Sequence, residues 1–398
     1  MQELEIDDRE FRCWVAERIQ ALPQQRVTFA QFMDWVLYTP QMGYYAANRQ
    51  KIGAGGDFVT SSHLGADFGE LLAEQFLDLW QSLGEPDGFQ VVEMGAGQGL
   101  IAEDVLKYVR SRTTEPLYAA FWQALKYAII EQSPSFLQEQ RLRLKPLADE
   151  HKLSWCTWSD IPNHSVVECF FSNELVDAFP VHRFEVRSGQ LQEIYVGVDA
   201  SLQFSEIVAE PSTPDLNAYL ETLHIDLSGY AEGYRSEINL AALDWLARVS
   251  QKLTQGYVLT IDYGHTATQY YSPQRHQGTL QCYYQQAHHD DPYWAIGHQD
   301  ITAHANFTAL QHFGAKQDLT TLGYTQQGLF LMALGLGDRL KANAAKLDQN
   351  VMDLLQRREA LHALANPMGL GNFGVLLQGK LPLAAATRYS FKGFRDMV

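Results

Sequence analysis

The sequence predicts an α/β fold in which an open, mainly parallel sheet carries helices on both faces. An N-terminal helical portion is expected before the sheet, and an insertion is expected in mid-chain. Hydrophobic residues make up 46% of the 398-residue chain and aromatic residues 12%, which is ample for a packed core. From Phe89 onward, short apolar runs of strand length alternate with amphipathic helical segments, a pattern typical of parallel sheets.

The N-terminal portion has a helical pattern interrupted by glycine. Thr28 is a plausible N-cap, and Pro23 separates the first two predicted helices. A glycine-rich stretch, 53–61, is expected to fold as a lid. The predicted helices cover 9–22, 28–38 and 62–83. The turn cluster at 84–88 ends this part, so we expect a cap and lid over 1–84 and the sheet domain over 85–398.

The sheet domain is predicted element by element from its apolar runs. Segment 181–210 alternates like an antiparallel hairpin and, with the helical pattern of 213–235, predicts an insertion at about 181–235. Strands are expected at 89–93, 127–131, 165–172, 256–263, 329–335 and 373–379. Helices are expected at 100–110, 135–147, 303–314 and near 338–364.

Composition and charge bear on partners and location. The chain has 30 Lys and Arg against 47 Asp and Glu, a formal net charge of −17, which would repel a phosphate backbone and argues against nucleic-acid binding. Four cysteines form no CxxC pair and are expected to be reduced thiols. No signal peptide and no membrane span are expected. These features predict a cytoplasmic protein and leave a homodimer open.

The segment 93–99, Glu-Met-Gly-Ala-Gly-Gln-Gly, is the strongest ligand-binding motif. A strand that ends in an acidic residue, followed by alternating glycines and a helix, typically binds a nucleotide because the glycines let the backbone approach it. Leu100 breaks the GxGxxG spacing of dinucleotide enzymes. The spacing E-x-G-x-G-x-G is typical of S-adenosylmethionine enzymes. The residues expected to bind this cofactor are Glu93, Gly95, Gly97 and Gly99.

Glu131 strengthens the cofactor prediction. It ends the next apolar run, Tyr-Ala-Ile-Ile-Glu, and could accept hydrogen bonds from both ribose hydroxyls. The alternative is that Glu131 caps the helix after Ser133-Pro134.

An ordered set of motifs resembles the MidA-like methyltransferases, a family that includes the mitochondrial complex I assembly factor that methylates an arginine. The resemblance covers most of the chain and implies a Rossmann-like S-adenosylmethionine methyltransferase sheet. The motifs that carry it are Pro-Gln-Met-Gly-Tyr-Tyr at 40–45, Gly-Asp-Phe-Val-Thr-Ser at 56–61, Phe-Gly-Glu at 68–70, the glycine loop, Glu-Gln-Ser-Pro at 131–134, 172–182, Ile-Asp-Tyr-Gly at 261–264 and Asp-Ile-Thr-Ala-His at 300–304.

Two departures from the family pattern bear on the site. Ser62 and His63 stand where the family usually has Pro and Glu, and Ala96 stands where the glycine loop usually has Pro. The first change removes a carboxylate from a predicted active-site segment. The substrate therefore does not follow from the resemblance alone.

The acceptor side is predicted to use carboxylates. Guanidinium is always protonated, and carboxylates that grip two of its nitrogens would hold it in place. Glu174 and Asp177 follow a predicted buried strand, where ligands bind in open α/β sheets, and are the expected clamp. Asn173 is assigned to the cofactor. The alternative is a helix cap at Asn173 with a solvated Asp177.

Three further residues are assigned from the lid and from the resemblance. Asp57 and Thr60 would face the cofactor if the glycine-rich stretch closes over it; otherwise they belong to a surface loop. His304, with Asp300 and Thr302, is expected to cap the helix at 303–314, and the resemblance places it near the substrate pocket. The run His-His-Asp-Asp at 288–291 is expected to be a solvated loop, because adjacent residues cannot all converge on a metal.

The resemblance implies a protein arginine methyltransferase that makes symmetric dimethylarginine on a partner protein, for which a respiratory-complex subunit is a candidate. Two other functions remain open. One is methylation of a small molecule or of another protein group. The other is an assembly chaperone that binds the cofactor; a pure binding module would not need Glu174 and Asp177 together.

Overall fold

The computed structural model describes residues 8–46, 61–165, 168–285, 287–344, 351–381 and 389–395. The chain divides into two compact units, each discontinuous in sequence. The first combines Met1–Phe58, Val176–Trp245 and Gly264–His312, and the second combines Val59–Leu175, Leu246–Tyr263 and Phe313–Val398. This division differs from the boundary expected at residue 84, because the helix that ends at Ser82 belongs to the core of the second unit.

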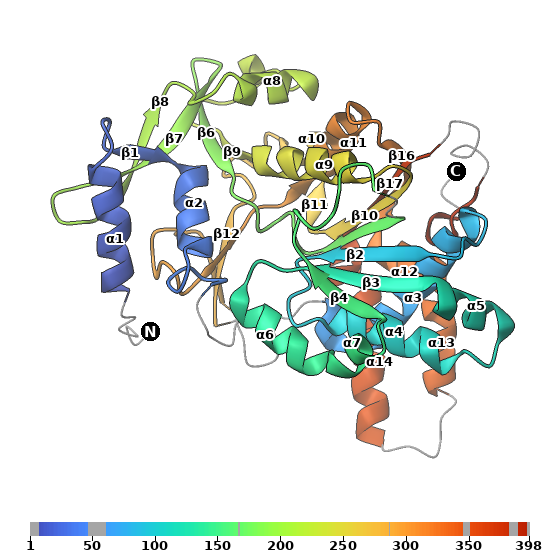
Figure 1. Cartoon of the computed structure of the whole chain (residues 1–398). Coiled ribbons are helices and arrows are strands. Elements are labelled where there is room, and N and C mark those ends of the chain that lie inside the picture. The colour runs from blue at the N-terminus through green and yellow to red at the C-terminus, as the bar shows by residue number, and fades with distance from the viewer. Residues whose placement is uncertain are drawn as a thin grey trace. The chain divides into compact units, whose positions relative to one another are not determined.

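The second unit is built on a seven-stranded sheet (Figure 1). Its strands are β2 (Phe89–Met94), β3 (Leu125–Ile130), β4 (Leu153–Cys156), β5 (Cys169–Asn173), β10 (Gly256–Asp262), β16 (Thr320–Gln326) and β17 (Gly374–Lys380). Their order is β16-β17-β10-β5-β2-β3-β4. The five strands from β10 to β4 pair in parallel, whereas β17 is antiparallel to both of its neighbours. This confirms the predicted α/β class with a Rossmann-like sheet.

The strand order reverses direction at β2. The chain passes from β2 outward to β3 and β4, and then returns to the opposite side of β2 with β5 and β10. The carboxyl ends of β2 and β5 therefore lie side by side at the point where open α/β sheets bind their ligands.

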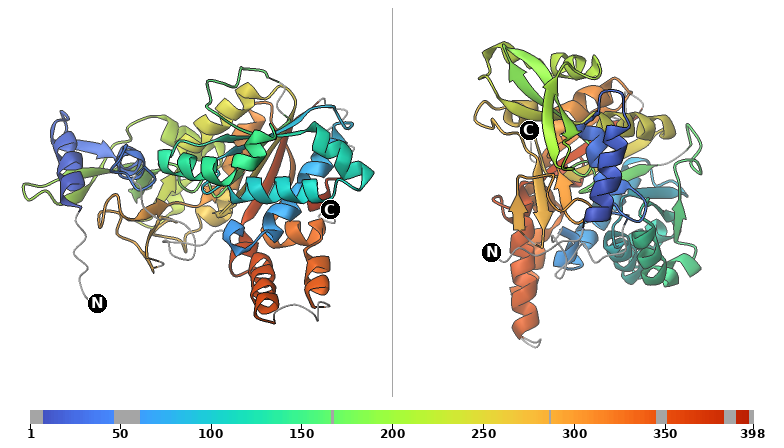
Figure 2. Two further views of the ribbon diagram at one scale, coloured as in Figure 1. Left: turned by 60° about the horizontal axis from the view of Figure 1, so that its bottom comes forward. Right: turned by 90° about the vertical axis from the view of Figure 1, so that its left-hand side faces the viewer.

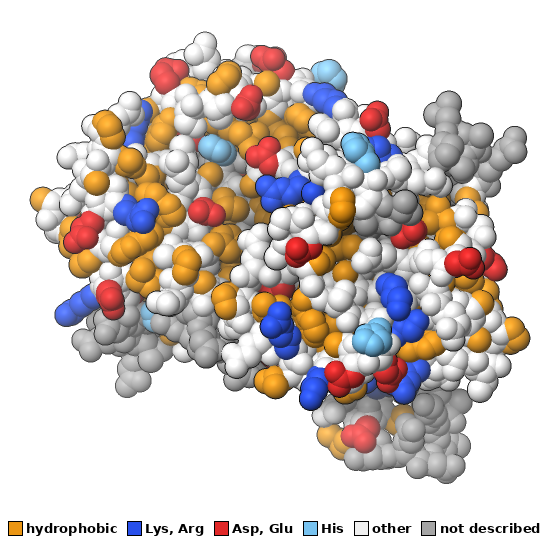
Figure 3. All heavy atoms as spheres, viewed as in Figure 1, with side chains coloured by type: hydrophobic (Ala, Val, Ile, Leu, Met, Phe, Trp, Pro, Cys, Tyr) orange, Lys and Arg blue, Asp and Glu red, His pale blue; other side chains and the backbone are white. Residues whose placement is uncertain are grey.

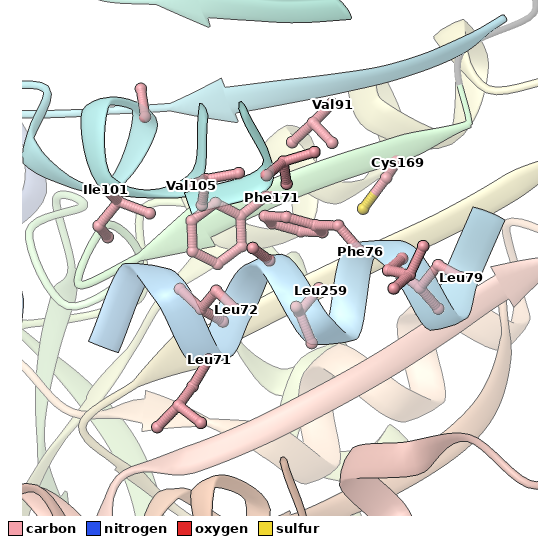
Figure 4. Packing of buried hydrophobic residues seen from close by; sticks show 14 of the residues in the cluster. Leu71, Leu72, Phe76, Leu79, Val91, Ile101, Val105, Cys169, Phe171 and Leu259 are labelled. Carbon is pink, nitrogen blue, oxygen red and sulfur yellow. The ribbon is translucent and has the colours of Figure 1, made fainter. Parts of the chain in front are cut away.

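A hydrophobic core lies between this sheet and its helices. Leu72 and Phe76 of α3 pack with Phe171 of β5 and Leu259 of β10, as Figure 4 shows, and all four side chains are buried. The rings of Phe76 and Phe171 meet edge to face at 5.5 Å. Both faces of a parallel sheet are covered, which explains why these two strands are buried along nearly their whole length.

The helices of the second unit follow the strands along the chain. The 3₁₀ helices are η1 (Ser61–Leu64), η3 (Leu370–Asn372) and η4 (Lys392–Phe394). The α-helices are α3 (Asp67–Ser82), α4 (Leu100–Ser111), α5 (Pro116–Ala124), α6 (Pro134–Arg143), α7 (Lys145–Asp149), α12 (Gln327–Leu334), α13 (Leu336–Ala344) and α14 (Val351–Ala365). Figure 2 shows α13 and α14 next to each other, in orange.

The first unit is mainly antiparallel. Its larger sheet has the order β1-β7-β6-β9, with β8 also paired to β7. The strands are β1 (Arg26–Thr28), β6 (His182–Arg187), β7 (Gln190–Val198), β8 (Phe204–Ala209) and β9 (Arg235–Ile238). Smaller sheets join β11 (Gly264–His265) to β15 (Ala305–Asn306), and β12 (Gln281–Tyr284) to β13 (Ala287–His289) and β14 (Asp300–Thr302).

The first unit also contains the N-terminal helices α1 (Arg9–Gln20) and α2 (Phe29–Tyr38), together with α8 (Asp215–Thr222), η2 (Leu227–Gly229) and α10 (Ala267–Tyr270). Thr28 caps α2 as predicted: its side chain accepts from the main-chain nitrogen of Gln31, whose own side chain accepts from Thr28. Two helices, α9 (Leu240–Lys252) and α11 (Phe307–Ala315), begin in the first unit and end in the second.

Three predicted elements were wrong. Residues 329–334 of the predicted strand 329–335 lie in α12, and Gly335, with φ of +113°, is the C-cap that follows this short helix. Residues 300–302 form β14 rather than a helix cap, and the helix begins at Phe307. The helix predicted from 62 begins only at Asp67, after η1. In the first case the cause is that a short, buried apolar run suits a helix as well as a strand.

Acidic and basic side chains are interspersed on the face drawn in Figure 3. Among the described helices, none has the length and hydrophobicity of a membrane span. Within the same residues, no three His, Cys, Asp or Glu side chains group in a way that could hold a metal ion.

Candidate cofactor and acceptor site

The glycine loop connects β2 to α4 by a backbone that suits glycine. Gly95, Gly97 and Gly99 have φ of +69°, +54° and +75°. A Cβ on Gly95 would lie 2.7 Å from Cδ1 of Leu175, so the loop after β2 closely approaches the segment after β5. The glycines therefore allow both the turn and the close contact.

Glu93, which precedes this loop, is buried at 2% exposure. The hydroxyl of Tyr127 on β3 donates to its Oε2 at 3.0 Å. Burial raises the pKa of Glu93 to about 8, although the hydrogen bond from Tyr127 acts in the opposite direction. The raised pKa favours the protonated form of Glu93 in the folded protein, and its hydrogen bond with Tyr127 connects β2, which carries the loop, to β3.

Glu131 directly follows β3, which is paired to β2. Its Oε1 accepts from the main-chain nitrogen of Ser133 at 2.8 Å, and its Oε2 accepts from Nε2 of Gln140 at 3.2 Å. Ser133, rather than Glu131, is the N-cap of α6. Burial raises the pKa of Glu131, and the hydrogen bonds from Ser133 and Gln140 lower it.

Gln140 connects Glu131 to the glycine loop. The same Nε2 also donates to the carbonyl oxygen of Gly97 at 2.7 Å, while Oε1 accepts from the indole Nε1 of Trp155 at 3.0 Å. The sequence analysis missed this residue. Gln140 could have been identified from its position four residues after the apolar Phe136, because that spacing places both side chains on the same, buried face of α6.

Asn173 and Glu174 lie at the carboxyl end of β5. Glu174 has φ of +51°, its main-chain nitrogen donates to Ile261, and its Oε1 accepts from Nδ2 of Asn173 at 3.0 Å. The main-chain nitrogen of Ser61 lies 3.4 Å from the same oxygen. A non-glycine residue in this left-handed region is uncommon and is often found at functional sites.

Ser61 joins Glu174 to a second residue that the sequence analysis missed, Gln327. Both Ser61 and Gln327 are fully buried, and the Ser61 hydroxyl lies 3.2 Å from Nε2 of Gln327, the first residue of α12. His63, which stands in place of the family's Glu, has its Nε2 3.0 Å from Oε1 of Gln98 in the glycine loop. Burial lowers the pKa of His63.

Asp177 and His304 belong to the first unit, so the boundary between units passes between Glu174 and Asp177. Asp177 is 6% exposed, and its carbonyl oxygen accepts from the main-chain nitrogen of Ala303 at 2.9 Å. The ring of His304 lies 5.0 Å from that of His265, and burial lowers the pKa of His304 to about 3. Asp300 accepts from the hydroxyl of Tyr45.

Asp57 and Thr60, assigned to the lid, lie outside the described residues. The residues that are described fit S-adenosylmethionine. Gly95 is exposed and Gly97 is partly exposed, and Oδ1 of Asn173 is buried with no hydrogen-bond partner in the described part of the chain. Glu131 offers oriented carboxylate oxygens beside the loop.

Comparisons with known proteins agree with this geometry. Residues 71–325 match the family described as "Putative S-adenosyl-L-methionine-dependent methyltransferase". The structure resembles the crystal structure of a candidate methyl transferase from Burkholderia thailandensis bound to S-adenosyl-homocysteine. The TM-score is 0.83 at 27% identity, covering 97% of this chain and 95% of that one.

Two curated relatives are similar over most of their length. The mitochondrial protein arginine methyltransferase NDUFAF7 homolog of Drosophila melanogaster is 27% identical, over 95% of this chain and 87% of the relative. The mitochondrial protein arginine methyltransferase NDUFAF7 of Homo sapiens is 27% identical, over 88% and 80%. Because these relatives are mitochondrial, the predicted cytoplasmic location was wrong.

The family match covers more than half of the chain, and the glycine loop lies inside it. S-adenosylmethionine, predicted from the spacing of that loop, is the cofactor that the family uses. The chain belongs to the S-adenosylmethionine-dependent methyltransferases, in the MidA-like family that its motifs resemble.

Proposed function

We propose that this enzyme is a protein arginine N-methyltransferase that makes symmetric dimethylarginine, with Glu174 as the residue that holds the guanidinium. One observation carries the proposal. Glu174 follows β5 and the glycine loop follows β2, and these two parallel strands are adjacent where the strand order reverses. The names of the relatives, which are protein arginine methyltransferases, support the choice of acceptor.

A carboxylate suits this acceptor for an electrostatic reason. When bound, S-adenosylmethionine supplies an electrophilic methyl group on a sulfonium. Guanidinium keeps its charge and delocalises its lone pairs, so its nitrogens are poor nucleophiles. A bidentate contact from Glu174 would draw positive charge toward two nitrogens and aim the third for in-line attack.

The residues assigned to the cofactor follow β2 and the two strands paired to it, β3 and β5. The glycine loop would receive the methionine and ribose portions, and Glu131 would accept from both ribose hydroxyls. Asn173 would contact the cofactor through its buried Oδ1. Glu93, Asp57 and Thr60 keep the assignment to the cofactor that the sequence predicts, Glu93 by its place just before the glycine loop.

Asp177 and His304 are assigned to the acceptor, and both lie in the first unit. Asp177 has weaker support as an acceptor residue than Glu174. Its contacts include a hydrogen bond to its main-chain carbonyl oxygen, which any residue could accept. The acceptor is a partner protein, and a respiratory-complex subunit is the candidate. A homodimer is the candidate oligomeric state.

The test compares the two ends of one strand. Glu174→Gln keeps the size of the side chain and removes the charge, whereas Glu168→Gln does the same beside the amino end of β5, where Glu168 accepts from the main chain of Gln90. Methyl-labelled cofactor is incubated with a lysate that contains the acceptor, and the labelled protein is hydrolysed to identify its amino acids. Cofactor affinity is measured by calorimetry.

Glu174→Gln should lower transfer by about 100-fold or more through loss of a charge-assisted contact and of alignment. Cofactor affinity should stay within a few-fold, Asp177→Asn should have a smaller effect, and Glu168→Gln should transfer normally. Label in symmetric dimethylarginine supports the proposal. Label in a small molecule or in another amino acid refutes it, as does full transfer by Glu174→Gln. Partner binding without any transfer would instead indicate an assembly chaperone.

A further inference from the structure

Gln140 is a fully buried amide that contacts three separate parts of the cofactor side. Its Nε2 donates to Gly97 O at 2.7 Å and to Glu131 Oε2 at 3.2 Å, and its Oε1 accepts from Trp155 Nε1 at 3.0 Å. One side chain thus joins the loop after β2, the carboxylate after β3 and the strand β4.

Trp155 decides which way the amide points. An indole N–H can only donate, so it selects the carbonyl end of Gln140 and turns both amide hydrogens toward Gly97 and Glu131. The reversed amide would place its oxygen against two acceptors and its NH2 against a donor. Because the site is buried, such mismatched contacts are costly, and a single orientation remains.

This arrangement also orients both oxygens of Glu131. The main-chain nitrogen of Ser133 holds Oε1 and Gln140 holds Oε2. The remaining lone pairs therefore have fixed directions relative to the Gly97 carbonyl, which the same amide holds. A diol with fixed geometry, such as a ribose, would be recognised by this pair of oxygens.

The geometry points to Gln140 and Trp155 as positioning residues that make the enzyme select a cofactor with both ribose hydroxyls. The inference rests on the assignment of Glu131 to the ribose made under the proposed function. It does not depend on what the acceptor is.

The test measures selectivity rather than affinity alone. Calorimetry gives the dissociation constants of S-adenosylhomocysteine and of its 2′-deoxy analogue, and their ratio is compared among variants. Gln140→Leu removes the amide, and Trp155→Phe removes only the donor that orients it. Gln138→Leu, on an exposed residue of the same helix, is the matched control. If a substitution destabilises the protein and weakens the binding of both ligands equally, the ratio of the two dissociation constants does not change.

The wild type should prefer S-adenosylhomocysteine by roughly 10-fold, the effect of one charge-assisted hydrogen bond. Gln140→Leu should reduce the ratio to less than about 3, Trp155→Phe should reduce it partly, and Gln138→Leu should leave it unchanged. Trp155→Phe still provides the test if Gln140→Leu fails to fold.

An unchanged ratio in Gln140→Leu and Trp155→Phe, even with both affinities lowered, would show a merely structural role and overturn the inference. So would a wild type without preference, or a Glu131→Gln variant that keeps it, because Glu131 would then not bind the ribose. No acceptor takes part in these measurements, so none of these outcomes bears on arginine as the acceptor.

Discussion

Two carboxylates follow the strands on either side of β2, and they are held by different kinds of contact. Glu131 receives its hydrogen bonds from Ser133 and Gln140, two and nine residues later in the chain. Glu174 receives them from its neighbour Asn173 and from Ser61, 113 residues earlier.

The cofactor side around Glu131 and the acceptor side around Glu174 therefore depend on contacts of different range in the chain. Ser133 and Gln140 lie close to Glu131 in the chain, in the turn after β3 and in α6, although Gln140 also contacts Gly97 after β2 and Trp155 on β4. The segments around Glu174 meet only when the second unit has folded. Substitutions near Glu174 should therefore affect methyl transfer and spare cofactor affinity, whereas substitutions near Glu131 should affect both.

The largest effect is expected on the cofactor side, from Gly97→Val. A branched side chain at φ of +54° is strained, and it would occupy the space that the cofactor needs to contact the backbone. Cofactor affinity should fall by at least about 1000-fold, or about 4 kcal/mol. Thermal shift with S-adenosylmethionine and with NAD measures this, because a ligand that binds only the native state raises its melting temperature.

Gly88→Val is the control for this substitution. Gly88 lies just before the other end of β2, is exposed, and has nothing within 4 Å of the position that a Cβ would occupy. This variant should be stabilised by S-adenosylmethionine as the wild type is. Equal stabilisation of the wild type by NAD would contradict the cofactor assignment.

Glu93→Gln should change how the stability of the protein depends on pH. Glu93 lies on β2, which is paired to both β3 and β5. The pKa of Glu93 is raised from 4.5 to about 8 in the folded protein. Between these values the folded state keeps a proton that the unfolded state has lost. The free energy of unfolding therefore falls as the pH rises through this window. A glutamine has no such proton to lose.

From pH 5 to pH 8, Glu93→Gln should gain stability relative to the wild type by on the order of 3–4 kcal/mol. Urea unfolding at several pH values measures the difference. A difference that does not change with pH would mean that Glu93 titrates near its ordinary pKa in the folded protein.

The smallest effect is expected from Gln327→Leu on the acceptor side. The change removes the buried partner of Ser61, and Ser61 in turn contacts Glu174. Methyl transfer should fall by roughly 10-fold, because misplacement of a catalytic group is costly. Cofactor affinity should remain within about 3-fold of the wild type, because a change on the acceptor side should lower methyl transfer without weakening cofactor binding.

Gln326→Leu, at the exposed neighbouring residue, is the matched control and should transfer normally. Both variants are measured by initial rates at saturating cofactor and by calorimetry. Equal losses of transfer and cofactor affinity in Gln327→Leu would place Ser61 on the cofactor side and contradict the comparison.

The parts of the molecule that the sequence predicted well depend on residues close together in the chain. The N-cap at Thr28 bonds to a residue three positions later, and the glycine loop lies directly between β2 and α4. The buried strands β5 and β10 were predicted from the apolar residues that each of them contains, Cys-Phe-Phe in β5 and Tyr-Val-Leu in β10. These signals need no knowledge of distant partners.

Other features could not be predicted in this way. The apolar run at 329–335 suits a strand or a buried helix, and its packing in the second unit made it α12. Gln140 and Gln327 look like surface glutamines in the sequence, yet both are fully buried. Glu174 and Asp177, three residues apart, were expected to act as a pair but belong to different compact units.

By itself, the sequence determined the α/β class, the glycine loop and the acidic residues that follow the strands, because spacing, capping and hydrophobic periodicity are local properties. Only the tertiary structure decided that β2 and β5 are neighbours, which amides orient Glu131 and Glu174, and which apolar runs are helical. The physical reason is that burial and hydrogen-bond partners are set by residues far apart in the chain, whose contacts exist only in the folded protein.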